Sequence, residues 1–253
     1  YINLKNNNEA IKNFKKALEI EPNFFQSHFN LANTLKKERK YKDSINSYLE
    51  VIKINPKFLG SYQQIGSIYK TLGKNHEAIE YYKKLLKINP DNSEGYNDLG
   101  NAYKNINEID LAIENYQKSL DINPKDGITN NNIAIAFSEK FEFEKAFKHF
   151  ENAIEYKNKN NMFFSNYLLT MNYPSKFDFK KYMHIVQKFK DTYYLNDIDK
   201  KKINDYRYEI KPKSLKLGFV SPDFGIHPVG FFTLDIIKQL KNLNFEIFGY
   251  TSS

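Results

Sequence analysis

The chain has 253 residues, of which 41% are hydrophobic, so it can bury a core and form one to three domains. It contains no cysteine, which excludes disulfides and thiolate metal sites. The net charge is +8, but the lysines are scattered along the sequence, which favours solvated helix surfaces over a nucleic-acid site. No apolar run approaches the roughly 20 residues of a membrane span. We therefore expect a cytoplasmic protein without membrane or nucleic-acid partners.

A repeat of 34 residues dominates the first 160 residues. Prolines stand at positions 22, 56, 90 and 124, and the residues leading to them are similar: ALEIEP, VIKINP, LLKINP and SLDINP. Small residues recur in the same register at 32, 66, 100 and 134, and again at 44, 78, 112 and 146. Small side chains allow two antiparallel helices to pack closely, and large apolar residues between them suit inner helix faces. The pattern resembles the tetratricopeptide repeat, whose helix pairs stack into a curved solenoid.

The repeats start at residues 25, 59, 93 and 127, and a half repeat with Ala10, Phe14 and Ala17 precedes them. In each full repeat the proline is expected to end the second helix, because the residue before a proline is pushed out of the helical conformation. Asn158 stands where the fourth repeat would carry its proline. We therefore predict a tetratricopeptide solenoid over residues 1–160.

Polar side chains recur at two positions of the repeat. The sixth position holds Asn30, Gln64, Asp98 and Asn132, and the ninth holds Asn33, Ser67, Asn101 and Ile135. Amides carry both donors and acceptors, so a row of them can bind the backbone of an extended peptide with little regard for its side chains. The alternative is that asparagine is simply common in this chain and that these are ordinary surface residues. The predicted peptide groove consists of Asn30, Asn33, Gln64, Asp98, Asn101 and Asn132.

Residues 161–212 are predicted to connect the solenoid to a second domain. The stretch 163–174 is aromatic and apolar enough to be buried, and 178–195 has helical spacing with apolar residues on one face. His184 in this helix is interpreted as a surface or boundary residue. The charged stretch that follows, as far as Pro212, is typical of a loop or linker.

Residues 213–253 are predicted to begin an α/β domain. LKLGFVS (215–221) and FEIFGYTS (245–252) are typical of strands, and FFTLDIIKQLKNL (231–243) has helical periodicity. This order predicts one βαβ unit with parallel strands. The expected fold class is therefore mostly α: a tetratricopeptide α-solenoid, a helical connector and a first βαβ unit.

The stretch SPDFGIHPVG (221–230) leaves the carboxyl end of the first predicted strand, where open α/β sheets bind ligands. Gly230 permits close approach, and Pro228 suits the first turn of a helix whose N-terminus attracts anions. His227 has an ordinary pKa near ~6.5 and can act as acid or base at neutral pH. Asp223 either orients this histidine or shapes the turn. A purely structural turn histidine is the alternative.

The order of the repeats, SNYLLTMNYP (165–174), LKLGFVSPDFGIHPVGFF (215–232) and NFEIFGYTSS (244–253) resembles the protein O-linked N-acetylglucosamine transferase family, including its bacterial SPINDLY-type members. The resemblance implies a catalytic region of two Rossmann-like halves, the GT-B arrangement. It implies transfer of a sugar from a nucleotide sugar, commonly UDP-N-acetylglucosamine, to Ser or Thr of proteins, with inversion at the anomeric carbon. It implies no required metal and no cofactor beyond the donor substrate.

The same resemblance assigns roles to residues. The solenoid is expected to guide the acceptor polypeptide, and Asn30 and Asn132 match inner-face asparagines, whereas Gln64 and Asp98 depart from that pattern. His227 matches the family histidine after SPDF and is a candidate base for the acceptor hydroxyl, or a group that positions substrate. The substrate-binding assignment also includes the turn residues Asp223, Pro228 and Gly230.

The chain begins with Tyr1 and ends at Ser253, directly after a predicted strand, so we expect it to be a piece of a longer protein. In the family, the residues that hold the nucleotide come mostly from a second half that is absent here. Residues 1–253 alone are therefore predicted to transfer nothing. Two alternatives stay open: a tetratricopeptide interaction scaffold without catalysis, or a relative that uses another donor such as GDP-fucose or glycosylates asparagine.

Overall fold

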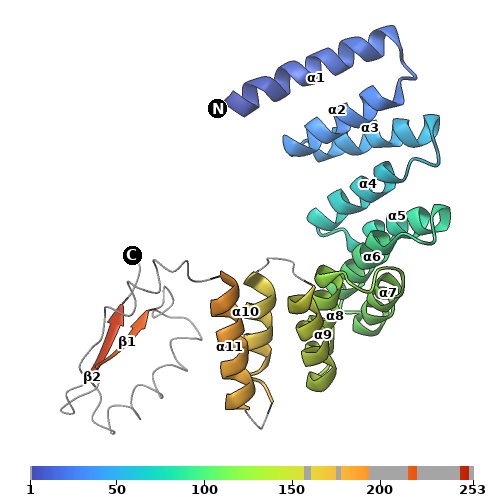
Figure 1. Cartoon of the computed structure of the whole chain (residues 1–253). Coiled ribbons are helices and arrows are strands. Elements are labelled where there is room, and N and C mark those ends of the chain that lie inside the picture. Colours follow the sequence, from blue (N-terminus) through green and yellow to red (C-terminus); the bar gives the residue numbers. More distant parts are fainter. Residues whose placement is uncertain (1, 157–160, 175–177, 194–215, 221–245, 251–253) are drawn as a thin grey trace. The chain divides into compact units, whose positions relative to one another are not determined.

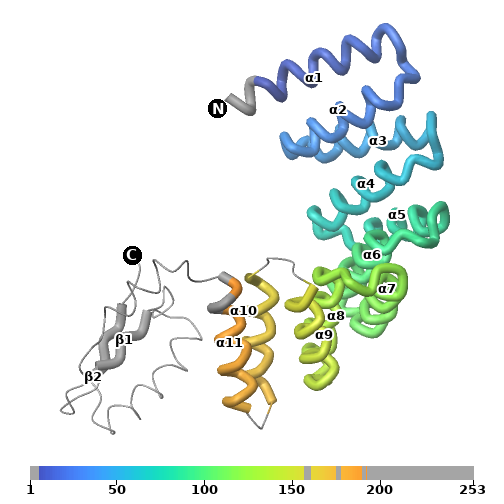
Figure 2. The backbone as a smooth tube through the Cα atoms, in the orientation of Figure 1, coloured from blue at the N-terminus to red at the C-terminus, as the bar shows by residue number. Residues whose placement is uncertain are grey.

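The computed structural model describes residues 2–156, 161–174, 178–193, 216–220 and 246–250 (Figure 1). The chain divides into two compact units, residues 1–193 and 194–253. Helices make up the described part of the first unit, and their succession is easiest to follow in the backbone tube (Figure 2). In chain order they are α1 (Ile2–Ile20), α2 (Phe25–Lys37), α3 (Tyr41–Ile54), α4 (Leu59–Thr71), α5 (Asn75–Ile88), α6 (Ser93–Asn105), α7 (Ile109–Ile122), α8 (Gly127–Glu139), α9 (Phe143–Glu155), α10 (Asn161–Thr170) and α11 (Phe179–Tyr193).

The regular spacing of the prolines sets where the second helix ends in the first three repeats. Helices α3, α5 and α7 stop just before Asn55, Asn89 and Asn123, each of which precedes a proline. Their φ angles are −132°, −133° and −128°, the extended backbone that a following proline imposes. The expectation that proline ends these helices is confirmed.

The turn between the two helices of each repeat is also built the same way four times. Arg39, Gly73, Asn107 and Phe141 have φ angles of 58°, 73°, 63° and 60°. The next residue donates its backbone N–H to the carbonyl five residues earlier, as Lys74 does to Tyr69 at 2.9 Å and Glu142 does to Phe137 at 2.9 Å. This is the left-handed helix cap that glycine and asparagine adopt most easily.

A large aromatic ring opposite a small residue forms the centre of each repeat. Tyr48, Tyr82, Tyr116 and Phe150 have no exposed surface. A Cβ atom on Gly66 would lie 2.7 Å from the ring of Tyr82, so the close approach of α4 and α5 depends on glycine there. The small residues that the sequence places at these positions therefore do pack at the contact between paired helices.

The helix stack continues beyond the last proline of the repeat pattern. Helix α10 packs against α8 and α9, and Tyr167 is fully buried with its ring stacked on Phe150 at a centroid distance of 5.4 Å. Asn166 Nδ2 donates to Asn131 Oδ1 at 3.0 Å, which repeats the bond from Asn132 Nδ2 to Asn97 Oδ1 at 2.9 Å one repeat earlier. Although Asn158 replaces the proline, α10 thus occupies the place of the next first helix.

In the second unit, β1 (Lys216–Val220) and β2 (Glu246–Tyr250) pair in parallel, with Lys216 opposite Glu246 and Val220 opposite Tyr250. Both strands fall within the two segments for which the sequence predicts strands. The predicted loop 221–230 and helix 231–243 lie outside the described residues, so the βαβ unit stays a prediction. Across the described helices, none is both long enough and apolar enough to cross a bilayer.

The fourth repeat contains a half-buried histidine whose protonation opposes folding. His149 Nδ1 lies 3.0 Å from Asn130 Oδ1, and the ring stacks on Phe137. Burial, with a smaller effect of Lys148, lowers the pKa of His149 below its ordinary value. The unfolded chain therefore binds a proton more readily than the folded chain. The free energy of unfolding is highest above pH ~6.5 and decreases as the pH falls below that value.

We expect the urea midpoint of the chain to decrease between pH 7 and pH 5, and His149→Gln to reduce that slope. His76→Gln, at an exposed position of α5, is the matched control and should keep the wild-type slope. An unchanged slope in His149→Gln would contradict the assignment.

Candidate peptide-binding face

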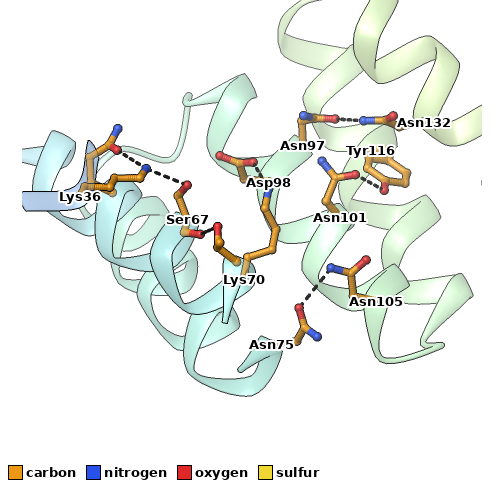
Figure 3. Close-up of polar contacts among 12 residues, drawn as sticks. Lys36, Ser67, Lys70, Asn75, Asn97, Asp98, Asn101, Asn105, Tyr116 and Asn132 are labelled. Atoms are coloured by element: carbon orange, nitrogen blue, oxygen red, sulfur yellow. Dashed lines mark hydrogen bonds and ion pairs between the residues drawn. The ribbon is translucent and has the colours of Figure 1, made fainter. Parts of the chain in front are cut away.

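The first helices of successive repeats are linked by side chains at equivalent positions. We call the residues at the sixth, ninth and twelfth positions of α2, α4, α6, α8 and α10, together with their fifth-position partners Asn97 and Asn131, the first-helix face. Figure 3 shows its central part, where Lys36, Ser67, Lys70 and Asp98 follow one another across the helices. Hydrogen bonds between these side chains join each repeat to the next. The face is therefore a continuous polar row and not a set of isolated surface residues.

A lysine occupies the twelfth position in three consecutive repeats. Lys36 Nζ donates to Gln64 Oε1 at 2.7 Å and to Ser67 Oγ at 3.1 Å. Lys70 Nζ donates to Asp98 Oδ1 at 3.0 Å, and Lys104 Nζ lies 3.9 Å from Glu139 Oε1. These lysines were not among the predicted site residues, although Lys36, Lys70 and Lys104 are spaced by one repeat, because lysine is abundant throughout the chain.

Lys36 differs electrostatically from the other two lysines of the row. Among the described residues its hydrogen bonds go to an amide and a hydroxyl oxygen, with no carboxylate among them. Burial lowers the pKa of Lys36, the neighbouring charge of Lys70 lowers it further, and Asp98 acts in the opposite direction. A half-buried ammonium bonded only to neutral oxygens still attracts an anion.

The predicted amide residues all lie on this face, but they do different things. Asn33 Oδ1 accepts from the Tyr48 hydroxyl at 2.6 Å, and Asn101 Oδ1 accepts from the Tyr116 hydroxyl at 2.9 Å. These two asparagines thus fix the buried tyrosines, and their NH₂ groups have no partner among the described residues. Burial raises the pKa of Tyr48 to about 12, so its hydroxyl stays a donor.

The remaining members of the predicted groove are a bridge, two acceptors and an exposed side chain. Asn132 Nδ2 donates to Asn97 Oδ1, and Asn97 was not among the predicted site residues. Gln64 and Asp98 accept hydrogen bonds from lysines of the preceding repeat. Asn30 is exposed on α2. The row therefore contains donors and acceptors, and ammonium groups share it with the amides.

The second repeat lacks the tyrosine–asparagine bond that the first and third repeats make. Its ninth residue is Ser67, which is shorter than asparagine and accepts from Lys36. The hydroxyl of Tyr82 is buried and has no partner among the described residues. A buried donor without a partner costs stability. The fourth repeat avoids the same cost in another way, because it carries Phe150 and Ile135 at these two positions.

We expect Ser67→Asn to supply the missing acceptor and to raise the free energy of unfolding by about 1 kcal/mol. Chemical denaturation of the Ser67→Asn variant measures this effect, and Ser67→Asn combined with Tyr82→Phe serves as the control because it removes the hydroxyl that the new amide would bind. An equal gain with and without the Tyr82 hydroxyl would show that the amide acts by another route.

A cavity of about 340 Å³ opens where the row reaches α10. Its lining is mostly apolar and combines the end of α8, the turn after it, the first residue of α9, and α10 with the turn that follows it. The lining residues are Ile135, Ser138, Glu139, Phe141, Phe143, Asn166, Leu169, Thr170 and Tyr173. Ile135 and Ser138 hold the ninth and twelfth positions of their repeat, so the cavity is part of the first-helix face.

The four residues predicted for sugar transfer, Asp223, His227, Pro228 and Gly230, lie outside the described residues. Their arrangement around the end of β1 stays a prediction. The described first-helix face is therefore the site whose geometry supports a functional interpretation.

Comparison with known proteins agrees with the repeat pattern. Tetratricopeptide repeat models match residues 25–58, 59–92 and 93–126, and a TPR repeat model matches residues 1–38. No protein of curated function matches the chain in sequence.

Solved structures with a similar fold include MamA (26% identity, TM-score 0.55), and the match covers 60% of this chain and 89% of the MamA chain. The match to PilF of Pseudomonas aeruginosa (16% identity, TM-score 0.61) covers 81% of this chain and 92% of the PilF chain. YrrB, described as a TPR protein with an unusual peptide-binding site (18% identity, TM-score 0.55), covers 76% and 97%. The matched repeats and the shared fold together identify the chain as a tetratricopeptide repeat protein.

Proposed function

We propose that the first-helix face binds an extended polypeptide. The observation that carries the proposal is the continuous row of amides and ammonium groups that links α2 to α10 through bonds between neighbouring repeats. The NH₂ groups of Asn33 and Asn101 lie in this row and suit backbone carbonyls of a peptide. YrrB, which has the same fold, is described as having a peptide-binding site, and this supports the same use of the fold here.

The structure makes a selective test of this proposal available. Asn33 and Asn101 are unsuitable for replacement because each holds a buried tyrosine hydroxyl, whereas Asn30 and Asn132 do not. We expect the Asn30→Ala, Asn132→Ala double variant to weaken a long unstructured polypeptide more than a short peptide, in fluorescence anisotropy titrations. Replacement of the exposed Asn23 and Asn46 by alanine is the matched control. Equal weakening of long and short ligands would count against the row.

We further propose that the polypeptide is the acceptor of a protein glycosyltransferase whose first α/β half begins near residue 213. This second proposal rests on the resemblance of residues 165–174 and 215–253 to the O-linked N-acetylglucosamine transferase family. The parallel pairing of β1 with β2 favours it, because parallel strands need a crossover connection such as a helix. In this proposal His227 takes the proton of the acceptor hydroxyl or positions a substrate, and nucleotide binding falls to residues beyond Ser253.

The test uses the protein extended past Ser253, with UDP-N-acetylglucosamine and GDP-fucose as alternative donors. Donor binding and sugar transfer are measured separately, for the natural sequence and for His227→Ala. We expect transfer to collapse in His227→Ala while donor binding persists, and residues 1–253 alone to transfer nothing. An extended protein that binds polypeptide but neither donor would instead be an interaction scaffold.

A further inference from the structure

The first-helix face changes its chemistry from one end to the other. Helices α2 and α4 contain no acidic residue, and they carry Lys36, Lys37 and Lys70. Helix α6 introduces Glu94 and Asp98. Thereafter the ninth and twelfth positions become Ile135 and Ser138 on α8, and the ninth position of α10 is Leu169. A polypeptide that follows the row thus meets cationic groups first and an apolar cavity last.

The cationic end has a feature that marks it as more than a solvated lysine surface. Ser67 replaces the asparagine that would satisfy the buried hydroxyl of Tyr82, and its oxygen instead accepts from Lys36. The second repeat therefore lacks a stabilising bond at the place where the Lys36 ammonium sits. Local departures from a repeated stabilising pattern are expected at functional positions.

The apolar end carries three exposed hydrophobic side chains around one cavity. Phe141, Leu169 and Tyr173 are 77%, 58% and 64% exposed. Phe141 also has a φ of 60°, in a turn where the equivalent residues include Gly73 and Asn107. An aromatic residue is unfavourable in this conformation, which Arg39 adopts in the first repeat, and the Phe141 ring is largely exposed, with an edge-to-face contact to Phe143. Both facts indicate that Phe141 serves the cavity and not the fold.

We propose that the polypeptide ligand has two recognition elements: an acidic side chain that binds Lys36, and a large apolar side chain that fills the cavity between α8 and α10. The inference deepens the proposed polypeptide binding and rests on it. The carboxylate receives a charge-assisted hydrogen bond from the ammonium, which now has only neutral acceptors. The apolar side chain covers the ring of Phe141 and the exposed part of Leu169, and the cavity volume of about 340 Å³ is at the lower end of ligand sites.

Four synthetic peptides of equal length test both elements with the 253-residue chain. One has an acidic segment of glutamates and a single phenylalanine near one end, and the second and third replace the glutamates by glutamine or the phenylalanine by alanine. The fourth carries both changes. In anisotropy titrations we expect each single change to weaken binding about tenfold. The double change should be weaker still.

Variants of the protein assign each element to its site. Lys36→Gln should remove the preference for glutamate and leave the preference for phenylalanine, with Lys42→Gln on α3 as the matched control. Leu169→Gln should do the reverse, with the exposed Leu111→Gln on α7 as its control. Both replaced side chains are at least partly exposed, so the variants are expected to fold.

The outcomes separate the inference from the proposed function. Equal binding of all four peptides overturns the two-element inference and leaves polypeptide binding intact. Failure of every peptide and of long unstructured polypeptides overturns both. Sedimentation of the chain alone tests whether a second copy covers the cavity: a dimer that Leu169→Gln dissociates would overturn the assignment of the cavity to a peptide side chain.

Discussion

Replacement of Tyr167 by alanine is expected to lower the free energy of unfolding of the α10 region by about 3–5 kcal/mol. The Tyr167 ring has no exposed surface, packs against Phe147 and Phe150 at 5.5 and 5.4 Å between centroids, and its hydroxyl donates to Glu151 Oε1 at 2.8 Å. Its loss creates a cavity at the contact that holds α10 on α9. Because stacked repeats contact only their neighbours, the damage should stay at this end of the stack.

Hydrogen exchange resolves this local effect better than a global midpoint does. Amides of α10 should exchange much faster in Tyr167→Ala, whereas amides of α4 and α5 should keep their protection. Tyr173→Ala is the matched control, since the same side chain there is 64% exposed and its removal should change stability by less than about 0.5 kcal/mol. Uniform loss of protection along the chain would mean that the stack unfolds as one cooperative unit.

Gly100→Val is expected to destabilise the third repeat by about 3 kcal/mol. A Cβ at this position would lie 2.6 Å from the ring of Tyr116 and 3.1 Å from the backbone oxygen of Ala112. The ring cannot move aside easily because it is fully buried and its hydroxyl is bonded to Asn101. The valine therefore has to push α6 and α7 apart, which also loosens the polar row on α6.

Gly73→Asn is the control for replacement of a glycine as such. No atom lies within 4 Å of a Cβ on Gly73, and Asn107 adopts the same left-handed conformation one repeat later. The urea midpoint of the Gly73→Asn variant should therefore stay close to that of the natural sequence. If Gly100→Val were equally mild, the contact between α6 and α7 would not depend on a small residue.

The periodic part of the fold was predictable because the same residue types recur at the same positions of successive repeats. Prolines fix the ends of α3, α5 and α7, and small residues fix the contacts between paired helices. The docking of α10 was not predictable in this way, since it has Leu168 where the earlier repeats have Ala or Gly, and Asn158 stands where a proline would precede it. Its position depends on the stacking of Tyr167 on Phe150, which only the packed structure reveals.

The site was predictable in composition but not in detail. The sixth and ninth positions do lie on one face, as their spacing indicates. However, the partner of an asparagine depends on side-chain direction, so sequence alone did not distinguish Asn33, which holds Tyr48, from the exposed Asn30. The cavity was missed because it combines α8 with a helix that the proline pattern does not include. The assignment of His227 stays a prediction.

The bonds between first helices also determine how this part of the chain should respond to a pulling force. Each connects residues about one repeat apart, as Lys70 to Asp98 and Asn132 to Asn97 do, so no described bond of the row ties α2 directly to α8. Pulling on the two ends should therefore peel repeats off one after another at modest force. A polypeptide bound along the whole row would contact all of these repeats at once. Its presence should therefore couple their unfolding and make the rupture steps fewer and larger.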